Sequence, residues 1–395
     1  MSKKQGQSRA RLTPKQKAAK KRRNIIIFCV ELLVLAVVII AAWAIIRFTG
    51  TERTNLSAGV MEDPNAEKDS DVIYINPNIG ANVSDEGKIE VEDTNPMSGY
   101  TQIALFGVDS RAKKLSSGDN RSDTIIIACI NNETKEVKLV SVYRDTYLNL
   151  STDYYNKCNG AFASGGPSAA ITMLNTNLDL AITNYVTVGF TGLIDVIDAL
   201  GGVWVDVKES EIRHLNNYQV SMVGTTTDNV NYYADPGVDY TPVTQAGHQK
   251  LNGLQATAYC RIRYVGDDYG RTERQRTVIM AALEQAKDMD PAKLVNILNS
   301  SIFEEFETNL DIDDITDVLM NLGDYTIVES AGFPSMDLLT SGTIGGKGSC
   351  VVPTTLYDNV VWIHELLFDD PEYVPSAIVE AYSERIEADT APYLP

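Results

Sequence analysis

Two apolar runs, TIIIACI at residues 124–130 and VKLVSVY at residues 137–143, decide the fold class that this sequence predicts. Both are rich in Ile and Val, whose β-branched side chains favour strands. The run TQIALFG at residues 101–107 precedes them and has the same character. We therefore predict three strands between residues 100 and 143.

Segments with helical spacing follow these strands. Pro167 stands where a first-turn proline is tolerated, Thr191 is a candidate helix cap, and Gly201 is a candidate helix stop. Further on, strand-like and helix-like runs alternate, with strands expected at residues 182–188, 202–207 and 325–329 and helices at residues 165–178, 191–200, 291–301 and 356–368. This alternation predicts an α/β fold, a layered α-β-α domain with helices on both faces of a central mixed sheet.

The amino-terminal region has the composition of a membrane anchor. Residues 1–24 carry ten Lys and Arg and no acid, and residues 25–46 form an apolar run that only Glu31 interrupts. As a helix that run would be about 33 Å long, enough to cross a bilayer core of about 30 Å. Because basic flanks stay in the cytoplasm, we predict a cytoplasmic tail, a single transmembrane helix and an extracellular remainder. The anchor accounts for the basic head, so we expect no nucleic-acid binding.

The remaining chain is predicted to contain three parts. Residues 47–98 are rich in Asp, Glu, Asn, Ser and Gly and are typical of a flexible extracellular linker. Residues 99–372 are expected to form the folded domain and residues 373–395 a C-terminal tail. Five cysteines do not make a disulfide framework. The sequence leaves open how the four outside the predicted membrane helix pair, if at all: Cys129, Cys158, Cys260 and Cys350.

Charged pairs stand at the ends of the three predicted strands, where open α/β sheets bind ligands. Such pairs also brace loops, and each pair alone would fit that structural role. Three pairs within 40 residues favour a site, and they are Asp109 with Arg111, Arg121 with Asp123, and Arg144 with Asp145.

The stretch RIRYVGDDYGRTERQR at residues 261–276 holds five arginines and no lysine. It stands out because the whole chain has a net charge of -19, and residues 25–395, with 24 basic and 53 acidic residues, carry -29. The planar fork of arginine grips phosphate or carboxylate through two hydrogen bonds, which lysine cannot do. An anion site is one interpretation, and a salt-bridged surface helix is the other.

Spacing groups these arginines. Arg261 and Arg263 lie two apart on a predicted strand, CRIRY, and so share one face. Arg271, Arg274 and Gln275 lie on one side of the first turns of a predicted helix, whereas Arg276 falls on another face. Cations near a helix amino terminus oppose its dipole unless an anion joins them, so the pattern favours phosphate.

Absent motifs narrow the chemistry. The sequence has no HExxH or GxSxG motif, and GGKG at residues 345–348 lacks the Ser or Thr of a phosphate-binding P-loop. Its three histidines stand away from the charged pairs. Aspartate with arginine suits a hard cation, Mg²⁺ or Mn²⁺, held by carboxylates beside phosphoryl oxygens that arginines neutralise.

An ordered set of motifs resembles the LytR-CpsA-Psr family of cell-wall enzymes. It consists of GVDSR, RSDT, SVYRDT, NGAFASGG, DALGGVWVDV and LNGLQATAYCRIRYVGDDYGRTERQR. The resemblance implies a membrane-anchored extracellular phosphotransferase. It would move a glycopolymer, such as teichoic acid or capsule, from a polyprenyl-pyrophosphate carrier to a peptidoglycan hydroxyl. A lipid-pyrophosphate hydrolase and a wall-sensing regulatory binding protein remain as alternatives.

The resemblance also implies roles for single residues. Asp109 and Asp123 correspond to metal-associated aspartates, and Asp123, Arg144 and Asp268 to catalytically required residues. In one place the chain departs from the family pattern, because Tyr143 stands where proline often precedes the Arg-Asp pair. The residues implied to bind pyrophosphate are Arg111, Arg121, Arg261, Arg263, Arg271, Arg274 and Gln275.

Overall fold

A computed structural model describes residues 56–63, 69, 72–108, 115, 120–151, 153–226, 232–298, 300 and 306–394. All of these belong to one unit, Asn55–Pro395. Among them no helix is both long and apolar enough to cross a membrane. The predicted cytoplasmic tail and transmembrane helix, residues 1–46, lie outside the described residues, so that prediction stays untested.

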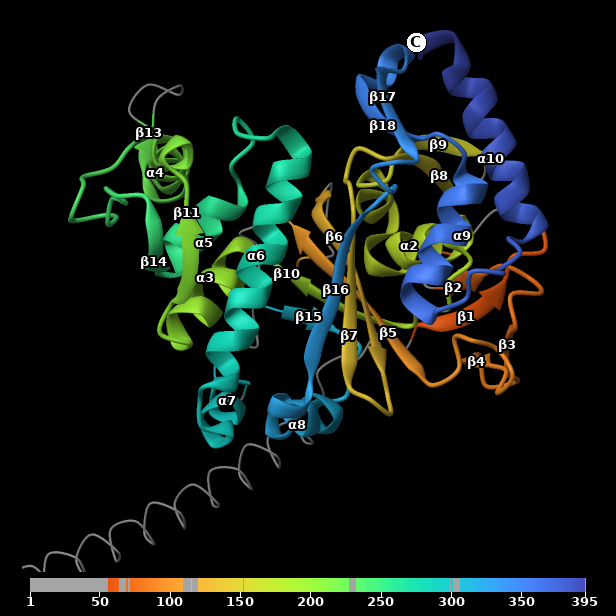
Figure 1. Cartoon of the computed structure of the whole chain (residues 1–395), viewed down its shortest axis with the longest axis horizontal. Coiled ribbons are helices and arrows are strands. Elements are labelled where there is room, and N and C mark those ends of the chain that lie inside the picture. Colours follow the sequence, from red (N-terminus) through yellow and green to blue (C-terminus); the bar gives the residue numbers. More distant parts are fainter. Residues whose placement is uncertain are drawn as a thin grey trace, which may run out of the picture. The chain divides into compact units, whose positions relative to one another are not determined.

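A six-stranded sheet forms the centre of the unit, with strand order β15-β10-β5-β6-β7-β16 (Figure 1). β10 runs parallel to β5 and β16 parallel to β7, and the other neighbouring pairs are antiparallel. The predicted central mixed sheet is therefore confirmed. Its strands are β5 (Tyr100–Val108), β6 (Ser122–Asn131), β7 (Glu136–Val142), β10 (Asn184–Val188), β15 (Phe306–Thr308) and β16 (Thr326–Phe333).

Alternate residues of the central strands pack into different cores, because successive side chains of a strand point to opposite faces. Ala104 and Phe106 pack in the main core with α2 (Gly160–Leu178), α9 (Leu356–Phe368) and α10 (Ala377–Thr390). Ile103 and Leu105 face a smaller core that includes Ile279 of α6 (Asp267–Lys287). Helices therefore cover both faces of the sheet, as the α-β-α prediction requires.

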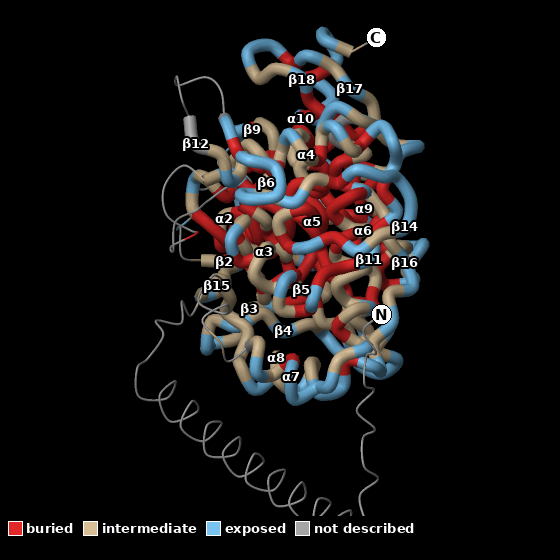
Figure 2. The backbone as a smooth tube through the Cα atoms, turned by 90° about the vertical axis from the view of Figure 1, so that its left-hand side faces the viewer, coloured by how far each residue is buried: buried red, intermediate tan, exposed pale blue. Residues whose placement is uncertain are grey.

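A separate core lies beside the sheet in the segment between β10 and α6. It packs α3 (Phe190–Ala199), α4 (Glu209–Val223) and α5 (Gly253–Cys260) against β11 (Val203–Val207) and β14 (Gly247–Leu251). Two short helices, α7 (Pro291–Leu298) and α8 (Ile312–Met320), follow. Figure 2 shows that burial is dense around α2 and α5 and sparse at α7 and α8.

Short paired strands complete the described secondary structure, together with 3-10 turns. Their bounds are β1 (Ser57–Val60), β2 (Val72–Ile75), β3 (Ala81–Val83), β4 (Ile89–Val91), β8 (Tyr147–Ser151), β9 (Tyr154–Lys157), β12 (Thr225–Thr226), β13 (Tyr232–Tyr233), β17 (Leu339–Thr343), β18 (Ser349–Pro353), η2 (Leu322–Asp324), η3 (Gly345–Lys347) and η4 (Ala391–Tyr393).

Both predicted boundaries of the folded domain are wrong. The segment predicted as a flexible linker, 47–98, contributes β1 to β4 to the fold, and its Ile73 and Ile75 are buried in the main core. The predicted tail, 373–395, forms α10. Asp179 joins the two ends: its Oδ1 accepts a hydrogen bond from Asn76 Nδ2 at 2.6 Å, and its Oδ2 accepts one from the Ser376 backbone at 2.7 Å. Both predictions rested on the average composition of each segment, which is polar although a few apolar residues anchor each end in the core.

Most predicted elements are present, and the exceptions are local. The helix at residues 356–368 has the predicted bounds, and Pro167 directly follows a break in α2 at Gly166. The Thr191 cap is wrong, because α3 begins at Phe190 with Gly189 as its cap. The strand CRIRY is also wrong, because α5 extends to Cys260 and Arg261 is its C-cap. None of the four described cysteines forms a disulfide with another described residue, and all four are buried.

Candidate active site

One edge of the sheet brings together Asp123 and Arg144, which belong to two of the three predicted charged pairs. β5 and β7 end at this edge, and β6 begins there because it runs antiparallel to both. Asp123 is the second residue of β6, and Arg144 lies two residues after β7. The sheet topology therefore brings together residues that lie 21 positions apart in the sequence.

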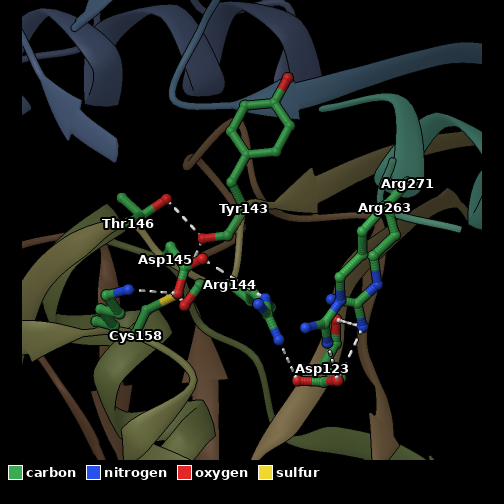
Figure 3. A network of polar contacts seen from close by, with 9 residues as sticks. Asp123, Tyr143, Arg144, Asp145, Thr146, Cys158, Arg263 and Arg271 are labelled. Atoms are coloured by element: carbon green, nitrogen blue, oxygen red, sulfur yellow. Dashed lines mark hydrogen bonds and ion pairs between the residues drawn. The ribbon is translucent and has the colours of Figure 1, made fainter. Parts of the chain in front are cut away.

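Three arginines converge on the carboxylate of Asp123 (Figure 3). Arg144 Nη1 lies 2.8 Å from Oδ1, while Arg263 Nη2 and Arg271 Nη2 lie 3.1 Å and 3.0 Å from Oδ2. Arg271 Nη2 also donates to the Asp123 backbone carbonyl at 3.0 Å. We call these four residues the Asp123 cluster. Its members come from β6, the loop after β7, the loop after α5 and the first turns of α6.

The cluster carries an excess of positive charge. Burial raises the pKa of Asp123, but the charges of Arg271, Arg144 and Arg263 outweigh burial and hold that pKa below its usual value. Asp123 is therefore ionised at neutral pH, and three guanidiniums against one carboxylate leave two positive charges. The Asp123 side chain is 17% exposed and that of Arg263 is 45% exposed, so one side of the cluster is open to a ligand. The arrangement suits a dianion such as pyrophosphate.

Backbone and thiol contacts hold the loop that carries Arg144. Thr146 Oγ1 donates to the Tyr143 carbonyl at 2.6 Å, and the Cys158 thiol donates to the same oxygen at 3.2 Å. The Asn159 amide donates to the Arg144 carbonyl at 3.1 Å. Thr146, Cys158 and Asn159 thus fix the turn from which Arg144 reaches Asp123; Figure 3 shows Thr146 and Cys158 beside this turn. The sequence KCNGAF at residues 157–162 contains no signal for this positioning role.

Arg274 does not join the cluster, which corrects its predicted role in pyrophosphate binding. Its Nη1 lies 3.2 Å from Glu211 Oε1, and Nη2 donates to the carbonyls of Ile262 at 2.6 Å and Val265 at 2.9 Å. Both side chains of the ion pair are buried, at 5% and 1% exposure. Arg274 therefore braces the loop that presents Arg263. Helical spacing predicted that Arg271 and Arg274 share one face of the helix. It could not predict that the two side chains pair with different acidic residues.

The other arginines of the stretch have different surroundings. The Arg261 guanidinium lies 4.3 Å from the centre of the Phe190 ring and 5.5 Å from that of Tyr218, as a cation–π contact. Gln275 is buried on α6, and Arg276 is partly buried, in the electrostatic range of Tyr143. The predicted shared face of Arg261 and Arg263 is wrong, since no strand carries them.

Several predicted site residues lie partly or wholly outside the description. Asp109 and Arg111 are not among the described residues. Asp268 lies in the first turn of α6, and its side chain is not described. Arg121 is exposed, one residue before β6. Within the described ranges no three His, Cys, Asp or Glu gather as a metal site, so the Asp109–Asp123 metal pair stays a prediction.

Spacing along the chain does not connect Asp145 with Lys157, yet the structure pairs them. Lys157 Nζ lies 3.1 Å from Asp145 Oδ1, and Arg144 Nε lies 3.6 Å from Asp145 Oδ2. A hairpin of β8 and β9 returns Lys157 to this position. Tyr143, the departure from the family pattern, packs edge-on against Tyr269 of α6 with ring centres 4.7 Å apart.

A known protein family includes all four residues of this site in the segment that it shares with the chain. A model of the LytR_cpsA_psr family matches residues 72–346, well over half of the chain. The chain belongs to this family. The match includes every residue of the Asp123 cluster, and it begins inside the segment whose composition suggested a linker.

Two curated relatives give the range of names within the family. Biofilm regulatory protein A of Streptococcus mutans is 30% identical over 240 residues, which cover 58% of this chain and 54% of that protein. The polyisoprenyl-teichoic acid–peptidoglycan teichoic acid transferase TagU of Enterococcus faecalis is 28% identical over 242 residues, which cover 60% of this chain and 69% of TagU. The chain thus spans about half the length of the streptococcal relative.

Solved structures share the fold. Bacillus subtilis TagV superposes with a TM-score of 0.52 at 25% identity, covering 70% of this chain and 98% of TagV. The structure named TagT bound to LIIa-WTA has a TM-score of 0.55 at 21% identity, covering 72% of this chain and 95% of TagT. These similarities establish the shared architecture.

Proposed function

We propose that this protein transfers an anionic glycopolymer from a polyprenyl-pyrophosphate carrier to a hydroxyl of peptidoglycan, forming a phosphodiester. The observation that carries the proposal is the Asp123 cluster, whose two excess positive charges complement a pyrophosphate. Relatives named teichoic acid transferases support the same reaction class. The cluster does not indicate which polymer is transferred, because it would contact the pyrophosphate that all such donors share.

The reaction follows from the charges in the cluster. An acceptor hydroxyl oxygen attacks the phosphorus that carries the glycopolymer, and the bond from this phosphorus to the bridging oxygen breaks. Polyprenyl phosphate leaves with the electron pair, and the hydroxyl proton passes to solvent. Negative charge spreads over the phosphoryl oxygens during transfer, so guanidiniums already fixed in position stabilise the transition state. Asp123 and the loop contacts of Arg144 supply that fixed position.

The residues present fit a hard divalent cation at one place. An ionised carboxylate offers about four lone-pair sites, and the arginines occupy one on Oδ1 and two on Oδ2 of Asp123. Counting only contacts between described residues, one site on Oδ1 would be left to hold Mg²⁺ or Mn²⁺, with Asp109 as the proposed second ligand. When bound, such an ion would neutralise phosphoryl charge.

The proposed reaction needs a domain on the outer side of a lipid bilayer, where the acceptor is located. We propose that residues 25–46 span the membrane once, because ten basic residues precede them. Protease added to intact protoplasts should then digest residues 47–395 and spare the basic tail, as read by antibodies against each end. Digestion of the tail, or full protection of the domain, would refute this topology.

Replacement of Arg271 by lysine tests the pyrophosphate site. Arg271→Lys keeps the charge but loses the planar guanidinium, whose Nη2 contacts both the carboxylate and the carbonyl of Asp123. Because hydrogen bonds to charged groups contribute about 1.5–3 kcal/mol, we expect transfer efficiency to fall about tenfold to over a hundredfold. The assay follows labelled glycopolymer from a polyprenyl-pyrophosphate donor into peptidoglycan fragments.

Arg213→Lys is the matched control, because Arg213 is exposed on α4 and an exposed charge contributes little. Equal, mild losses in both variants would refute the role of Arg271. Label released to water instead of reaching the glycan would identify a hydrolase.

A regulatory binding protein is the second candidate, favoured by the name of the streptococcal relative. It would bind the lipid pyrophosphate through the same arginines without turnover. Tight binding of the donor by the wild-type protein, with no label transferred or released over many enzyme equivalents, would select this alternative.

A further inference from the structure

A second pocket, of about 360 Å³, lies apart from the Asp123 cluster. Its volume falls in the range of about 300–1,000 Å³ typical of small-molecule sites. It is lined by β8, β9, the turn Gly345–Lys347 and α10, which lie together in Figure 1. Four of its eleven lining residues lie beyond the part that the family model matches: Lys347, Arg385, Asp389 and Tyr393.

Four of the eleven residues that line the pocket are tyrosines, so we call it the tyrosine pocket. Tyr154 and Tyr393 are about half exposed, at 54% and 49%, and present ring surface to solvent. Lys347 Nζ lies 5.5 Å from the Tyr147 ring centre and 5.1 Å from that of Tyr154, and it donates to the Tyr155 carbonyl. These contacts hold the rings in place before any ligand arrives.

The charged side chains of the pocket balance one another. Arg385 Nε lies 3.0 Å from Asp389 Oδ1, and its Nη1 lies 3.8 Å from Asp153 Oδ2. With Lys347 the pocket therefore holds two cations and two carboxylates. The Asp123 cluster has an excess of positive charge, which attracts an anion. The charged side chains of this pocket carry no net charge.

Fixed aromatic rings beside paired donors and acceptors match the chemistry of a sugar. A pyranose ring has an apolar C–H face that packs on an aromatic ring and hydroxyl groups that both donate and accept. Carboxylates accept from such hydroxyls, and guanidinium and ammonium groups donate to them. A saccharide without net charge would use all of these groups, whereas a polyanion would meet two carboxylates.

Ion pairs link the pocket wall to the proposed active site. Tyr147 of the pocket is the register partner of Lys157 across β8 and β9. Lys157 pairs with Asp145, which in turn pairs with Arg144 of the Asp123 cluster. The two sites are thus connected through β8, β9 and Asp145.

We propose that the tyrosine pocket binds a sugar ring of the acceptor glycan. The assignment of the sugar to the acceptor rests on the proposed transfer function, whereas the binding of a sugar rests on the pocket alone. The shared chemistry is a pyranose ring, which both the acceptor glycan and the donor polymer could supply, and the absence of excess positive charge selects the acceptor.

Binding of chitotetraose, an uncharged β-1,4-linked N-acetylglucosamine oligomer, tests the pocket directly. We expect the full-length protein in nanodiscs to bind it with a measurable Kd by saturation-transfer difference NMR. Tyr154→Ala and Tyr393→Ala should each raise that Kd roughly fivefold or more, since truncation of an aromatic anchor costs about 1 kcal/mol or more. Tyr233→Ala, at a tyrosine that is 60% exposed on β13, is the matched control and should change nothing.

Three results would overturn the proposal. One is no binding of chitotetraose at millimolar concentration, and another is an equal Kd in the wild-type protein and both pocket variants. The third is a poly(glycerol phosphate) oligomer that displaces chitotetraose and binds more tightly, because the pocket would then serve the donor.

A transfer assay separates this inference from the proposed function. Tyr154→Ala should raise the KM for peptidoglycan fragments several-fold while the KM for the lipid donor stays constant. An unchanged acceptor KM would overturn the acceptor assignment. If the wild-type protein transfers nothing, the proposed function fails, and the chitotetraose measurement still decides whether the pocket binds sugar.

Discussion

Asp123→Asn is expected to lower glycopolymer transfer by about a thousandfold, because one carboxylate orders three guanidiniums. Loss of a single preorganised group that stabilises developing charge costs about a hundredfold to a thousandfold, and here three such groups depend on Asp123. Asparagine is similar in size and keeps an acceptor oxygen, so the circular dichroism spectrum should not change. The measurement is transfer of labelled glycopolymer to peptidoglycan fragments under saturating donor.

The control for this variant is Asp206→Asn. Asp206 also makes a side-chain contact, with its Oδ1 3.2 Å from His248 Nδ1, but its side chain is 81% exposed on β11. Its replacement should leave transfer unchanged. Near-normal transfer by Asp123→Asn would refute the cluster as the catalytic site. Excess EDTA should abolish transfer by the wild-type protein, and undiminished turnover in EDTA would rule out the proposed metal.

Glu211→Gln is expected to destabilise the fold by about 3–5 kcal/mol, because it leaves the buried Arg274 charge without a counter-charge. The glutamine can still accept the hydrogen bond that the Lys208 amide donates to Glu211 at 2.9 Å, so the start of α4 should persist. Chemical denaturation of the full-length protein, followed by circular dichroism, measures the loss. An unchanged unfolding free energy would show that the ion pair contributes nothing.

Two further variants test how Arg274 contributes to stability and to transfer. Glu209→Gln changes an exposed acid in the same helical turn and should leave stability unchanged. Arg274→Met should destabilise the protein and also lower transfer by the folded fraction, because the carbonyls of Ile262 and Val265 lose their donor. Full transfer by the folded Arg274→Met variant would separate Arg274 from the positioning of Arg263.

Periodicity predicted the layers of this fold because it depends only on local patterns. Continuous apolar runs indicated the central strands, and helical spacing indicated α9 with its bounds and a helix that carries Arg271, as α6 does. The prediction failed where tertiary contacts decide the local structure. CRIRY has strand-like residues, yet packing of Ala256, Tyr259 and Ile262 in the second core keeps the chain helical up to Cys260.

Composition predicted the ends of the domain poorly because burial depends on a few residues and not on an average. The segment before Tyr100 is polar overall, but Met61, Ile73 and Ile75 suffice to anchor it in the main core. The last residues are acidic, yet Val379, Tyr382 and Ile386 form one buried face of α10. Neither segment could be assigned to the folded domain from sequence alone, because the assignment depends on the surface against which its apolar residues pack.

The sequence by itself determined which residue types would form the site, since only arginine with aspartate at strand ends offers this chemistry. It indicated Asp123, Arg144, Arg263 and Arg271, and the fold brings these four together. Tertiary structure alone decided that Arg274 pairs with Glu211 and that Cys158 and Lys157 hold the Arg144 loop. The physical reason is that spacing places side chains on a common face, whereas the partner of each charge depends on which distant segment that face meets.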